Sequence, residues 1–250
     1  MTNVHDEVTR GGFAIVPEVL SPDAVAALLG AFPSAAADAA SLDTAKETAP
    51  PARVASRRRR GGVYAARNIL SLPAVRAAAE SRAGRALVVP LLGASARPGR
   101  GIFFDKTPGA NWKVAWHQDL SIAVRRRTED APGYGPWSAK AGVVHVQPPR
   151  AVLEQMLTVR LHLDDCDDAN GPLKVIPGSH AHGVLAPAAL ERLVDAGSVT
   201  ACVVRAGGAV VMRPLILHAS SPATSPRHRR VVHLEFAAGE RPGGVEWAEN

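Results

Sequence analysis

The sequence has few cysteines, few aromatic residues and no long apolar run. Its two cysteines, Cys166 and Cys202, form no C-x-x-C unit and are too few for a disulfide framework, which agrees with a reducing compartment. No apolar stretch approaches the roughly 20 residues needed to cross a bilayer, so we expect no membrane span. Residues 1–7 have no basic segment leading into an apolar run, so we expect no secretory signal and a cytoplasmic location.

Aromatic residues make up only 4% of the chain, which leaves few platforms on which single-stranded bases can stack. A net charge of +6 and arginine-rich runs at 57–60, 125–127 and 227–230 nevertheless raise the question of nucleic acid. The run 57–60 follows a segment rich in Ala, Pro and Thr, so we expect a solvated loop there. We therefore expect no nucleic-acid partner, and the charge favours attraction of an anionic cosubstrate or substrate.

Length and composition indicate one globular domain. A chain of 250 residues can bury a substantial core, and 46% hydrophobic with 21% charged residues is typical of a soluble protein. We expect a single domain over residues 1–250, with a mainly helical support over 1–100 and a β core over 101–240. The segment from about residue 33 to 62 has the composition of a loop.

One strand and two helices are predicted in the first hundred residues. The sequence over 12–17 reads as a short strand. Ser21 offers an N-cap, a proline follows at the first helical position, and an apolar face then continues to Phe32. A second, alanine-rich helix is expected from Pro73 to about Leu92.

Beyond residue 100 short β-branched or apolar runs alternate with Gly, Pro, Asn and Asp, which is the pattern of an all-β sandwich or barrel. The acidic segment 164–171 ends in Asn170-Gly171, and we expect a tight hairpin turn there. A calcium loop is disfavoured because the acids do not follow the EF-hand order. The predicted strands are 101–105, 114–120, 142–146, 157–164, 173–176, 199–204, 209–212, 216–218 and 230–236.

Three residues have the pattern of a metal site. His117 and Asp119 form a His-x-Asp pair, and residues i and i+2 of an extended strand point to the same face. His218 lies 101 residues later, so only tertiary folding can bring it to the pair. Each of the nine histidines, taken singly, is more often a core or surface residue. Together, two imidazoles and one carboxylate are the ligand set of a non-haem iron(II) oxygenase.

The spacing of these residues resembles that of the phytanoyl-CoA dioxygenase family of Fe(II)- and 2-oxoglutarate-dependent oxygenases. The family pattern of His-x-Asp, a distal His and an Arg eleven positions further on is matched by His117, Asp119, His218 and Arg229. The likeness covers nearly the whole chain, and it implies a double-stranded β-helix, that is, a jelly-roll, cupin-like core with flanking helices. The other matching motifs are Gly12-Phe13, Phe104-Asp105-Lys106 and NGPLKVIPGSH over 170–180.

The resemblance also implies roles at the cosubstrate. Arg229 and Ser220 would bind the far carboxylate of 2-oxoglutarate, and Trp137 would line the same pocket. Arginine suits this task because its planar fork grips a carboxylate with two hydrogen bonds and keeps its charge. Arg227 and Arg230 are competitors, but strand alternation places Arg230 on the opposite face and Pro226 places Arg227 near a turn.

Other polar residues have more than one interpretation. Arg160 and His162 share a face of a predicted strand and, with Lys106, are candidates for substrate contacts or for structural positions in a barrel wall. His180-x-His182 resembles part of a zinc site, but nothing nearby completes a set of four ligands. We therefore expect no zinc site there.

The implied enzyme uses Fe(II), 2-oxoglutarate and O2, releases succinate and CO2, and hydroxylates an unactivated C–H bond of a small molecule. Related halogenases have a small residue in place of the carboxylate, so Asp119 disfavours halogenation. Desaturation, epoxidation and ring formation stay open, as do the substrate and the oligomeric state. Two other classes also stay open: a metal-dependent, cupin-like hydrolase or isomerase that does not use 2-oxoglutarate, and a basic polyanion-binding module.

Overall fold

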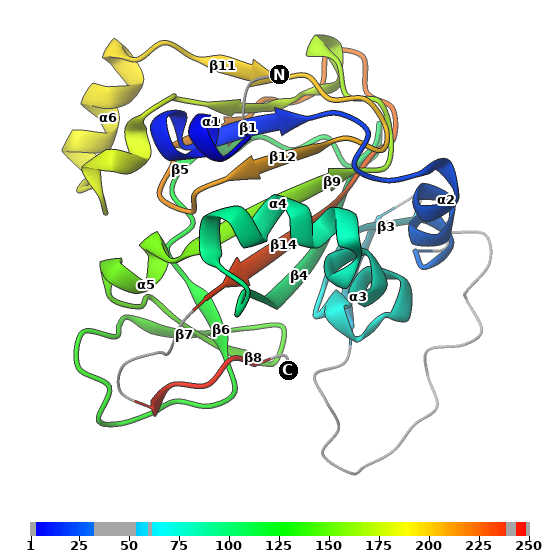
Figure 1. Ribbon diagram of the computed structural model, residues 1–250. Helices are drawn as coiled ribbons and strands as arrows, with labels where there is room; N and C mark the ends of the chain where they lie inside the picture. Colours follow the sequence, from blue (N-terminus) through cyan, green and yellow to red (C-terminus); the bar gives the residue numbers. More distant parts are fainter. Residues whose placement is uncertain (1–3, 33–53, 60–61, 239–243, 249–250) are drawn as a thin grey trace.

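The computed structural model describes residues 4–32, 54–59, 62–238 and 244–248. Their strands form three antiparallel sheets, and helices flank the largest of them (Figure 1). The predicted fold class, mainly β with flanking helices and a jelly-roll core, is confirmed. In spatial order, the large sheet consists of β1 (Phe13–Val16), β12 (Ala209–Met212), β9 (Met156–His162), β14 (Arg229–Ala237), β4 (Arg97–Lys106), β3 (Gly62–Arg67) and β2 (Ala55–Arg59).

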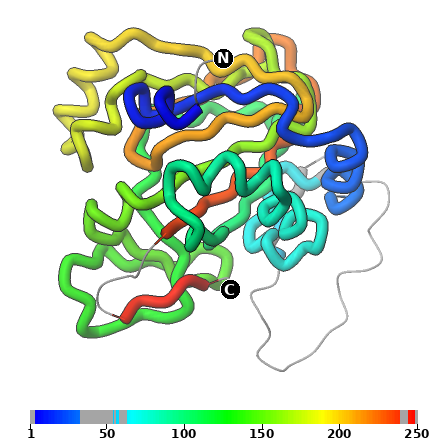
Figure 2. The backbone as a smooth tube through the Cα atoms, in the orientation of Figure 1, coloured from blue at the N-terminus to red at the C-terminus, as the bar shows by residue number. Residues whose placement is uncertain are grey.

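Two smaller sheets complete the β structure of the described residues. The four-stranded sheet consists of β11 (Thr200–Cys202), β10 (Leu173–Val175), β13 (His218–Ser220) and β5 (Val114–His117). The three-stranded sheet consists of β6 (Ile122–Val124), β8 (Val143–Val146) and β7 (Trp137–Lys140). Sequence order and spatial order differ, and Figure 2 shows β1, close to the N-terminus, running beside β12.

The helices of the described residues are all short, and none is long and apolar enough to cross a bilayer. The α-helices are α1 (Val4–Gly11), α2 (Pro22–Gly30), α3 (Pro73–Glu80), α4 (Arg82–Leu92), α5 (Arg150–Glu154) and α6 (Pro187–Ala196). The 3-10 helices are η1 (Ile69–Ser71), η2 (Asp168–Asn170) and η3 (Ser179–His182).

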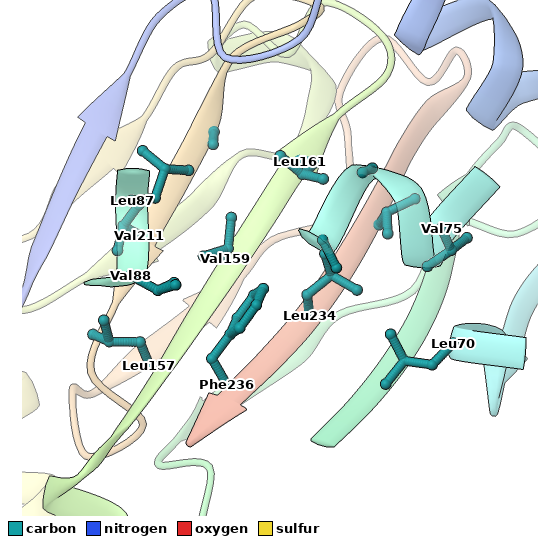
Figure 3. Packing of buried hydrophobic residues seen from close by; sticks show 14 of the residues in the cluster. Leu70, Val75, Leu87, Val88, Leu157, Val159, Leu161, Val211, Leu234 and Phe236 are labelled. Atoms are coloured by element: carbon teal, nitrogen blue, oxygen red, sulfur yellow. The ribbon is translucent and has the colours of Figure 1, made fainter. Parts of the chain in front are cut away.

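One face of the large sheet is apolar, and the other carries buried polar residues beside some hydrophobic ones. On β9, Leu157, Val159 and Leu161 pack into the main core, which α3 and α4 cover (Figure 3). The alternate residues of β9, among them Arg160 and His162, point to the other side and are also buried. The same alternation on β14 places Val232, Leu234 and Phe236 in the core and Arg229, His233 and Glu235 on the opposite face. This buried polar face is where a site can form.

The predicted helix over 73–92 is two helices. Ser81 ends α3 and caps α4, because its hydroxyl accepts a hydrogen bond from the Gly84 N–H at 3.0 Å. A Cβ at Gly84 would lie 2.5 Å from the carbonyl oxygen of Ala78, so glycine permits this close turn. The helix predicted after Ser21 is confirmed, with the Ser21 hydroxyl accepting from Ala24 N at 3.2 Å.

The arginine-rich segment predicted as a solvated loop is partly a strand. Residues 57–59 belong to β2, the edge strand of the large sheet, while Arg60 lies outside the described residues. Charged residues are a common feature of edge strands because they prevent pairing with other chains. The run of charge therefore marks a strand edge and does not exclude β structure.

The acidic segment is a crossover between sheets and not a hairpin. It leads from β9 in the large sheet to β10 in the four-stranded sheet. Asp164 binds Arg230, Asp165 accepts from the N–H of Ala206, and Asp167 caps η2. Asp164, Asp165 and Asp167 thus bind different parts of the chain and hold the crossover in place.

Candidate functional site

The His-x-Asp pair and the distal histidine meet where β5 and β13 lie side by side. His117 ends β5, His218 begins β13, and the two are register partners with ring centroids 4.1 Å apart. Asp119 follows β5 and does not belong to the strand, so the strand predicted over 114–120 ends early. Its Oδ1 is 3.8 Å from His117 Nε2, and its Oδ2 is 3.6 Å from His218 Nε2.

One donor atom from each of these three residues lies within 4.8 Å of the other two. Among the described residues, no other group of His, Cys, Asp or Glu side chains meets this condition. His218 is buried, whereas the side chains of His117 and Asp119 are 40% and 29% exposed. The three donors can therefore reach one ion from the same side, and solvent can reach the site.

Backbone carbonyls fix which nitrogen each histidine presents to this centre. His117 Nδ1 is 2.8 Å from the carbonyl oxygen of Ala115, and His218 Nδ1 is 3.0 Å from that of Ile216. A carbonyl only accepts hydrogen bonds, so we assign the proton to Nδ1 in both rings. Each Nε2 then presents a lone pair, which is the tautomer that a metal-binding imidazole needs.

The residue between the first two ligands ties them to neighbouring loops. Gln118 is buried, and its amide nitrogen donates to the carbonyls of Gly183 at 2.7 Å and Leu215 at 2.6 Å. Its Oε1 accepts one further backbone N–H. The Asp119 N–H donates to the Pro214 carbonyl at 2.9 Å. The segment after β5 is thus held in place although it is not part of a sheet.

The electrostatics of the three residues suit a cation. Burial alone raises the pKa of Asp119, but the charges of His218, His233 and His117 outweigh it and lower that pKa to about 2. Burial lowers the pKa of His218 to about 4. Asp119 Oδ2 is buried without a hydrogen-bond partner, a state that costs free energy unless another group binds it. A divalent metal ion that accepts nitrogen and oxygen ligands, such as Fe(II), fits these donors.

Two buried cations share a serine further along β13. The Arg229 guanidinium donates to the Gly171 carbonyl, and its Nη1 lies 3.4 Å from Ser220 Oγ. Lys106 is fully buried at the end of β4, where it is the register partner of Arg229. Its Nζ donates to Ser220 Oγ at 2.7 Å and to the Ser221 carbonyl at 2.5 Å.

No carboxylate forms an ion pair with Lys106 or Arg229 in the part of the chain that the structure describes. The nearby Asp105 pairs with His228 at 2.8 Å and accepts from the backbone N–H of Arg229 and not from its guanidinium. Burial, and then the charge of Arg229, lowers the pKa of Lys106 to about 7. Two adjacent buried cations without a counter-charge are a binding place for an anion.

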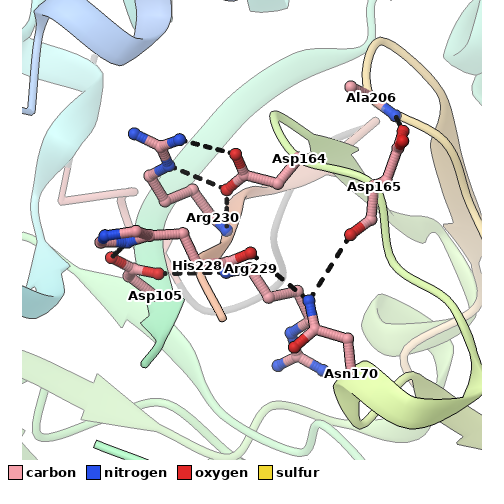
Figure 4. Close-up of polar contacts among 8 residues, drawn as sticks. All are labelled: Asp105, Asp164, Asp165, Asn170, Ala206, His228, Arg229 and Arg230. Atoms are coloured by element: carbon pink, nitrogen blue, oxygen red, sulfur yellow. Dashed lines mark hydrogen bonds and ion pairs between the residues drawn. The ribbon is translucent and has the colours of Figure 1, made fainter. Parts of the chain in front are cut away.

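The arginines on either side of Arg229 are already paired. Arg230 donates from Nε and Nη2 to the carboxylate of Asp164 at 2.8 and 2.6 Å (Figure 4). Arg227 pairs with Asp167 at 2.7 Å on the surface. The alternation predicted for this segment is therefore confirmed, and only Arg229 of the three turns to the polar interior.

A cavity of about 320 Å³ opens over the three candidate ligands and reaches the buried serine and arginine. The polar face of the large sheet forms one wall. There Arg160 Nη1 lies 2.9 Å from His233 Nδ1, and Arg100 donates to Glu235 at 2.9 Å. The remaining lining residues are Arg67, Ile102, Phe104, Trp112, Val114, Gln118, Leu120, Ser121, Lys140, Leu173 and Ala219.

Some predicted positions lie elsewhere. Arg160 lines the cavity, but His162, on the same face of β9, is buried without lining it, as is Lys106 behind Ser220. Trp137 lies on β7 beside Arg127, whose Cζ is 5.8 Å from the ring centroid. It packs against a separate apolar cluster and does not line the cavity, because the loop around it folds into the three-stranded sheet.

The other histidines do not complete a second site. His180 Nε2 lies 3.2 Å from the Thr9 carbonyl, His182 is exposed, and neither belongs to a group of metal donors among the described residues. His145 is buried on β8 with its Nδ1 3.0 Å from the Val143 carbonyl. The two cysteines are free and buried.

Sequence patterns missed several lining residues. Arg67 and Lys140 belong to β3 and β7, two strands that the sequence did not predict. Trp112 lies just before β5, and its position ahead of the His-x-Asp pair was the only available signal. His233 and Glu235 lie on the same face of β14 as Arg229, because alternate residues of a strand share a face. The sequence therefore indicates that they face the cavity once Arg229 is known to do so.

Comparison with known protein families identifies one family. The model of the family described as Phytanoyl-CoA dioxygenase (PhyH) matches residues 8–231. No curated protein matches the sequence significantly.

Solved structures match over nearly the whole chain. AviO1 from Streptomyces viridochromogenes Tue57 is 22% identical with a TM-score of 0.64, and the match covers 96% of this chain and 95% of that one. EctD from S. alaskensis with 2-oxoglutarate and 5-hydroxyectoine is 22% identical with a TM-score of 0.66, covering 98% and 80%. The epimerase SnoN in complex with Fe3+, alpha-ketoglutarate and nogalamycin RO is 17% identical with a TM-score of 0.62, covering 99% and 88%.

Proposed function

Since this chain belongs to the phytanoyl-CoA dioxygenase family, we propose that it is an Fe(II)- and 2-oxoglutarate-dependent oxygenase. His117, Asp119 and His218 hold the metal. The observation that carries this proposal is the Asp119 carboxylate between two Nε2 atoms, with its Oδ2 buried and without a hydrogen-bond partner. Iron(II) with 2-oxoglutarate and O2 supplies the oxidising chemistry, in which the cosubstrate is converted to succinate and CO2.

The protein's own residues place the cosubstrate. Arg229 and Ser220 line the cavity and bind its far carboxylate, while Lys106 lies behind Ser220 and supports them through its charge and its hydrogen bond to the Ser220 hydroxyl. Ser220 and His218 lie two residues apart on β13, a span of about 7 Å in an extended strand. This spacing suits a five-carbon diacid with one end at the metal. We therefore assign Lys106 a supporting role at the cosubstrate site, through Ser220, and no contact with the substrate.

The proposed reaction is hydroxylation of an unactivated C–H bond of a small molecule. Asp119 supports oxygen transfer over halogenation, since the carboxylate occupies the position that a halide would need. EctD is similar in fold, and its structure contains 5-hydroxyectoine, while SnoN is an epimerase. The triad is compatible with either outcome, and the substrate's position in the cavity decides between them.

Anaerobic addition of Fe(II) and then 2-oxoglutarate tests the proposal. A visible charge-transfer band should appear when the keto acid chelates the iron. Arg229→Gln should require roughly 30-fold more 2-oxoglutarate or higher, because truncating one partner of a buried charge pair costs about 2–5 kcal/mol. Arg227→Gln is the matched control, since this arginine already pairs with Asp167 at the surface.

A metal-dependent hydrolase or isomerase that does not use 2-oxoglutarate would bind the metal without developing this band. A basic polyanion-binding module would be indifferent to loss of Asp119 and would show a steep salt dependence. Either result would overturn the proposed function.

A further inference from the structure

A second and larger hollow, of about 800 Å³, continues the cavity outward. We call it the outer chamber. Arg67, Ile102, Phe104, Trp112 and Lys140 line both hollows, so the two are continuous. The remaining residues of the outer chamber are Ser56, Arg57, Tyr64, Ala65, Ala139 and Ala141.

The outer chamber is positively charged. Arg57, Arg67 and Lys140 line it, and no carboxylate does so among the described residues. Arg67 Nη1 is buried without a hydrogen-bond partner. Burial, and then the charges of Arg100 and Arg57, lowers the pKa of Arg67. These cations therefore lie close enough to repel one another, and an anion would relieve that repulsion.

The residues that line the cavity over the candidate metal ligands, here called the inner cavity, also carry an excess of positive charge. Five cations line it, against the two carboxylates of Asp119 and Glu235. A divalent metal ion and the doubly negative 2-oxoglutarate add no net charge. A surplus of positive charge thus stays in the cavity after both have bound, and the substrate is the remaining partner that can offset it. The five cations are Arg67, Arg100, Lys140, Arg160 and Arg229.

Three of the five residues that line both hollows form an apolar and aromatic surface beside the cations Arg67 and Lys140. Ile102 and Phe104 of β4 belong to this surface, and the Trp112 ring contacts the Tyr64 ring edge-on, with centroids 5.7 Å apart. The side chains of Ile102, Phe104 and Trp112 suit contact with a hydrocarbon or planar group of a ligand. The wall that the two hollows share thus combines two cations with an apolar surface that leads toward the candidate metal ligands.

We propose that the substrate bears an anionic group, a carboxylate or a phosphate, which binds in the outer chamber at Arg57, Arg67 and Lys140. Its apolar portion lies along Phe104 and Trp112 and presents the reacting carbon to the metal ligands. The reaction of this substrate at the metal ligands rests on the proposed function, whereas the binding of an anion in the outer chamber does not. Guanidinium groups bind both kinds of anion through paired hydrogen bonds.

Calorimetric titration with three small probes tests the proposal. Phenyl phosphate and benzoate carry the two candidate anions on one ring, and benzamide is the neutral analogue. Titrations are run on metal-free protein and on anaerobic protein saturated with Fe(II) and 2-oxoglutarate. We expect at least one anionic probe to bind ten or more times tighter than benzamide in both states, and the stronger of the two identifies the anion.

Variants locate the binding. Arg67→Gln should remove most of this preference, and Arg57→Gln, at an exposed position that the core does not need, should weaken it in the same direction. Arg82→Gln, an exposed arginine on α4 that lines neither hollow, is the control. All three should retain the charge-transfer band with 2-oxoglutarate.

Two failures are distinguishable. Equal affinity for anionic and neutral probes, or a preference that survives both Arg67→Gln and Arg57→Gln, overturns the inference even when the charge-transfer band forms. Absence of the band in the unmodified protein, with probe binding still dependent on Arg67, overturns the proposed function and leaves the anion site standing.

Discussion

His117 and His218 are register partners on β5 and β13, although 101 residues separate them in the chain. The register shifts between His218 and Ser220, so that Ser220 pairs with Val114. One short strand therefore carries a candidate metal ligand at its start and a candidate cosubstrate contact at its end. The distance between the two functions is set by the backbone of β13 and not by flexible side chains.

Asp119→Ala should strongly weaken iron binding while leaving the fold intact, because this carboxylate makes no hydrogen bond to the core through Oδ2. We expect Fe(II) affinity to fall by more than the roughly 10- to 100-fold that loss of a group behind a ligand causes. Metal analysis after dialysis measures the first effect, and far-UV circular dichroism checks the second. Asp168→Ala, at an exposed acid, is the control. Unchanged succinate formation by Asp119→Ala would contradict the assignment.

Gln118→Met should weaken iron binding by about 10- to 100-fold without touching a ligand, because the amide holds the segment between His117 and Asp119 to two loops. The two freed carbonyls should also lower the free energy of unfolding by about 2–4 kcal/mol. Fe(II) titration and urea denaturation separate the two effects, with Gln155→Met at an exposed position as the control. If stability falls while Fe(II) affinity stays the same, Gln118 is structural only.

The affinity for 2-oxoglutarate should depend on pH through Lys106. Burial and the charge of Arg229 lower its pKa to about 7 in the empty site, and a bound carboxylate raises that pKa again. Binding then takes up a proton above pH 7, so affinity is full below pH 7 and falls by up to about tenfold per pH unit above it. Calorimetry in buffers of different ionisation enthalpy measures the proton uptake.

Lys106→Met should bind 2-oxoglutarate more weakly and without this pH dependence. Lys113→Met, at an exposed lysine, should retain it. A pH profile that is the same in all three proteins would show that the charge of Lys106 does not support cosubstrate binding.

Acid should destabilise the protein through buried neutral histidines. Burial, followed by the charge of Arg100, lowers the pKa of His145 to about 4, and burial with the charge of Arg160 lowers that of His162 to about 3. The unfolded chain protonates both near pH 6.5, so stability is full above that pH and falls as the pH drops toward 4. Each contributes up to about 1.4 kcal/mol per pH unit.

Urea denaturation between about pH 7 and pH 4 measures this slope. His145→Gln should reduce it by one such contribution, and His182→Gln, at an exposed histidine, should not change it. An unaltered slope in His145→Gln would mean that His145 is already protonated in the folded state.

Local patterns in the sequence predicted those features that depend on neighbouring residues. Period-two alternation identified β9 and β14 and separated Arg229 from Arg230, because the faces of a strand follow from the backbone alone. The same reasoning failed for the segment 73–92, where Ser81 and Gly84 restart the helix through contacts with the preceding one. It also failed at the acidic crossover, since its partners Arg230 and Ala206 are distant in the chain.

By itself, the sequence determined the alternating polar and apolar faces of the long strands and the residue types available to bind a metal. The tertiary structure alone decided that His218 pairs with His117, that Lys106 joins Arg229 at Ser220, and that Trp137 lies away from the cavity. The physical reason is that alternation is a property of one strand, whereas a site requires strands from distant parts of the chain to pair in a particular register.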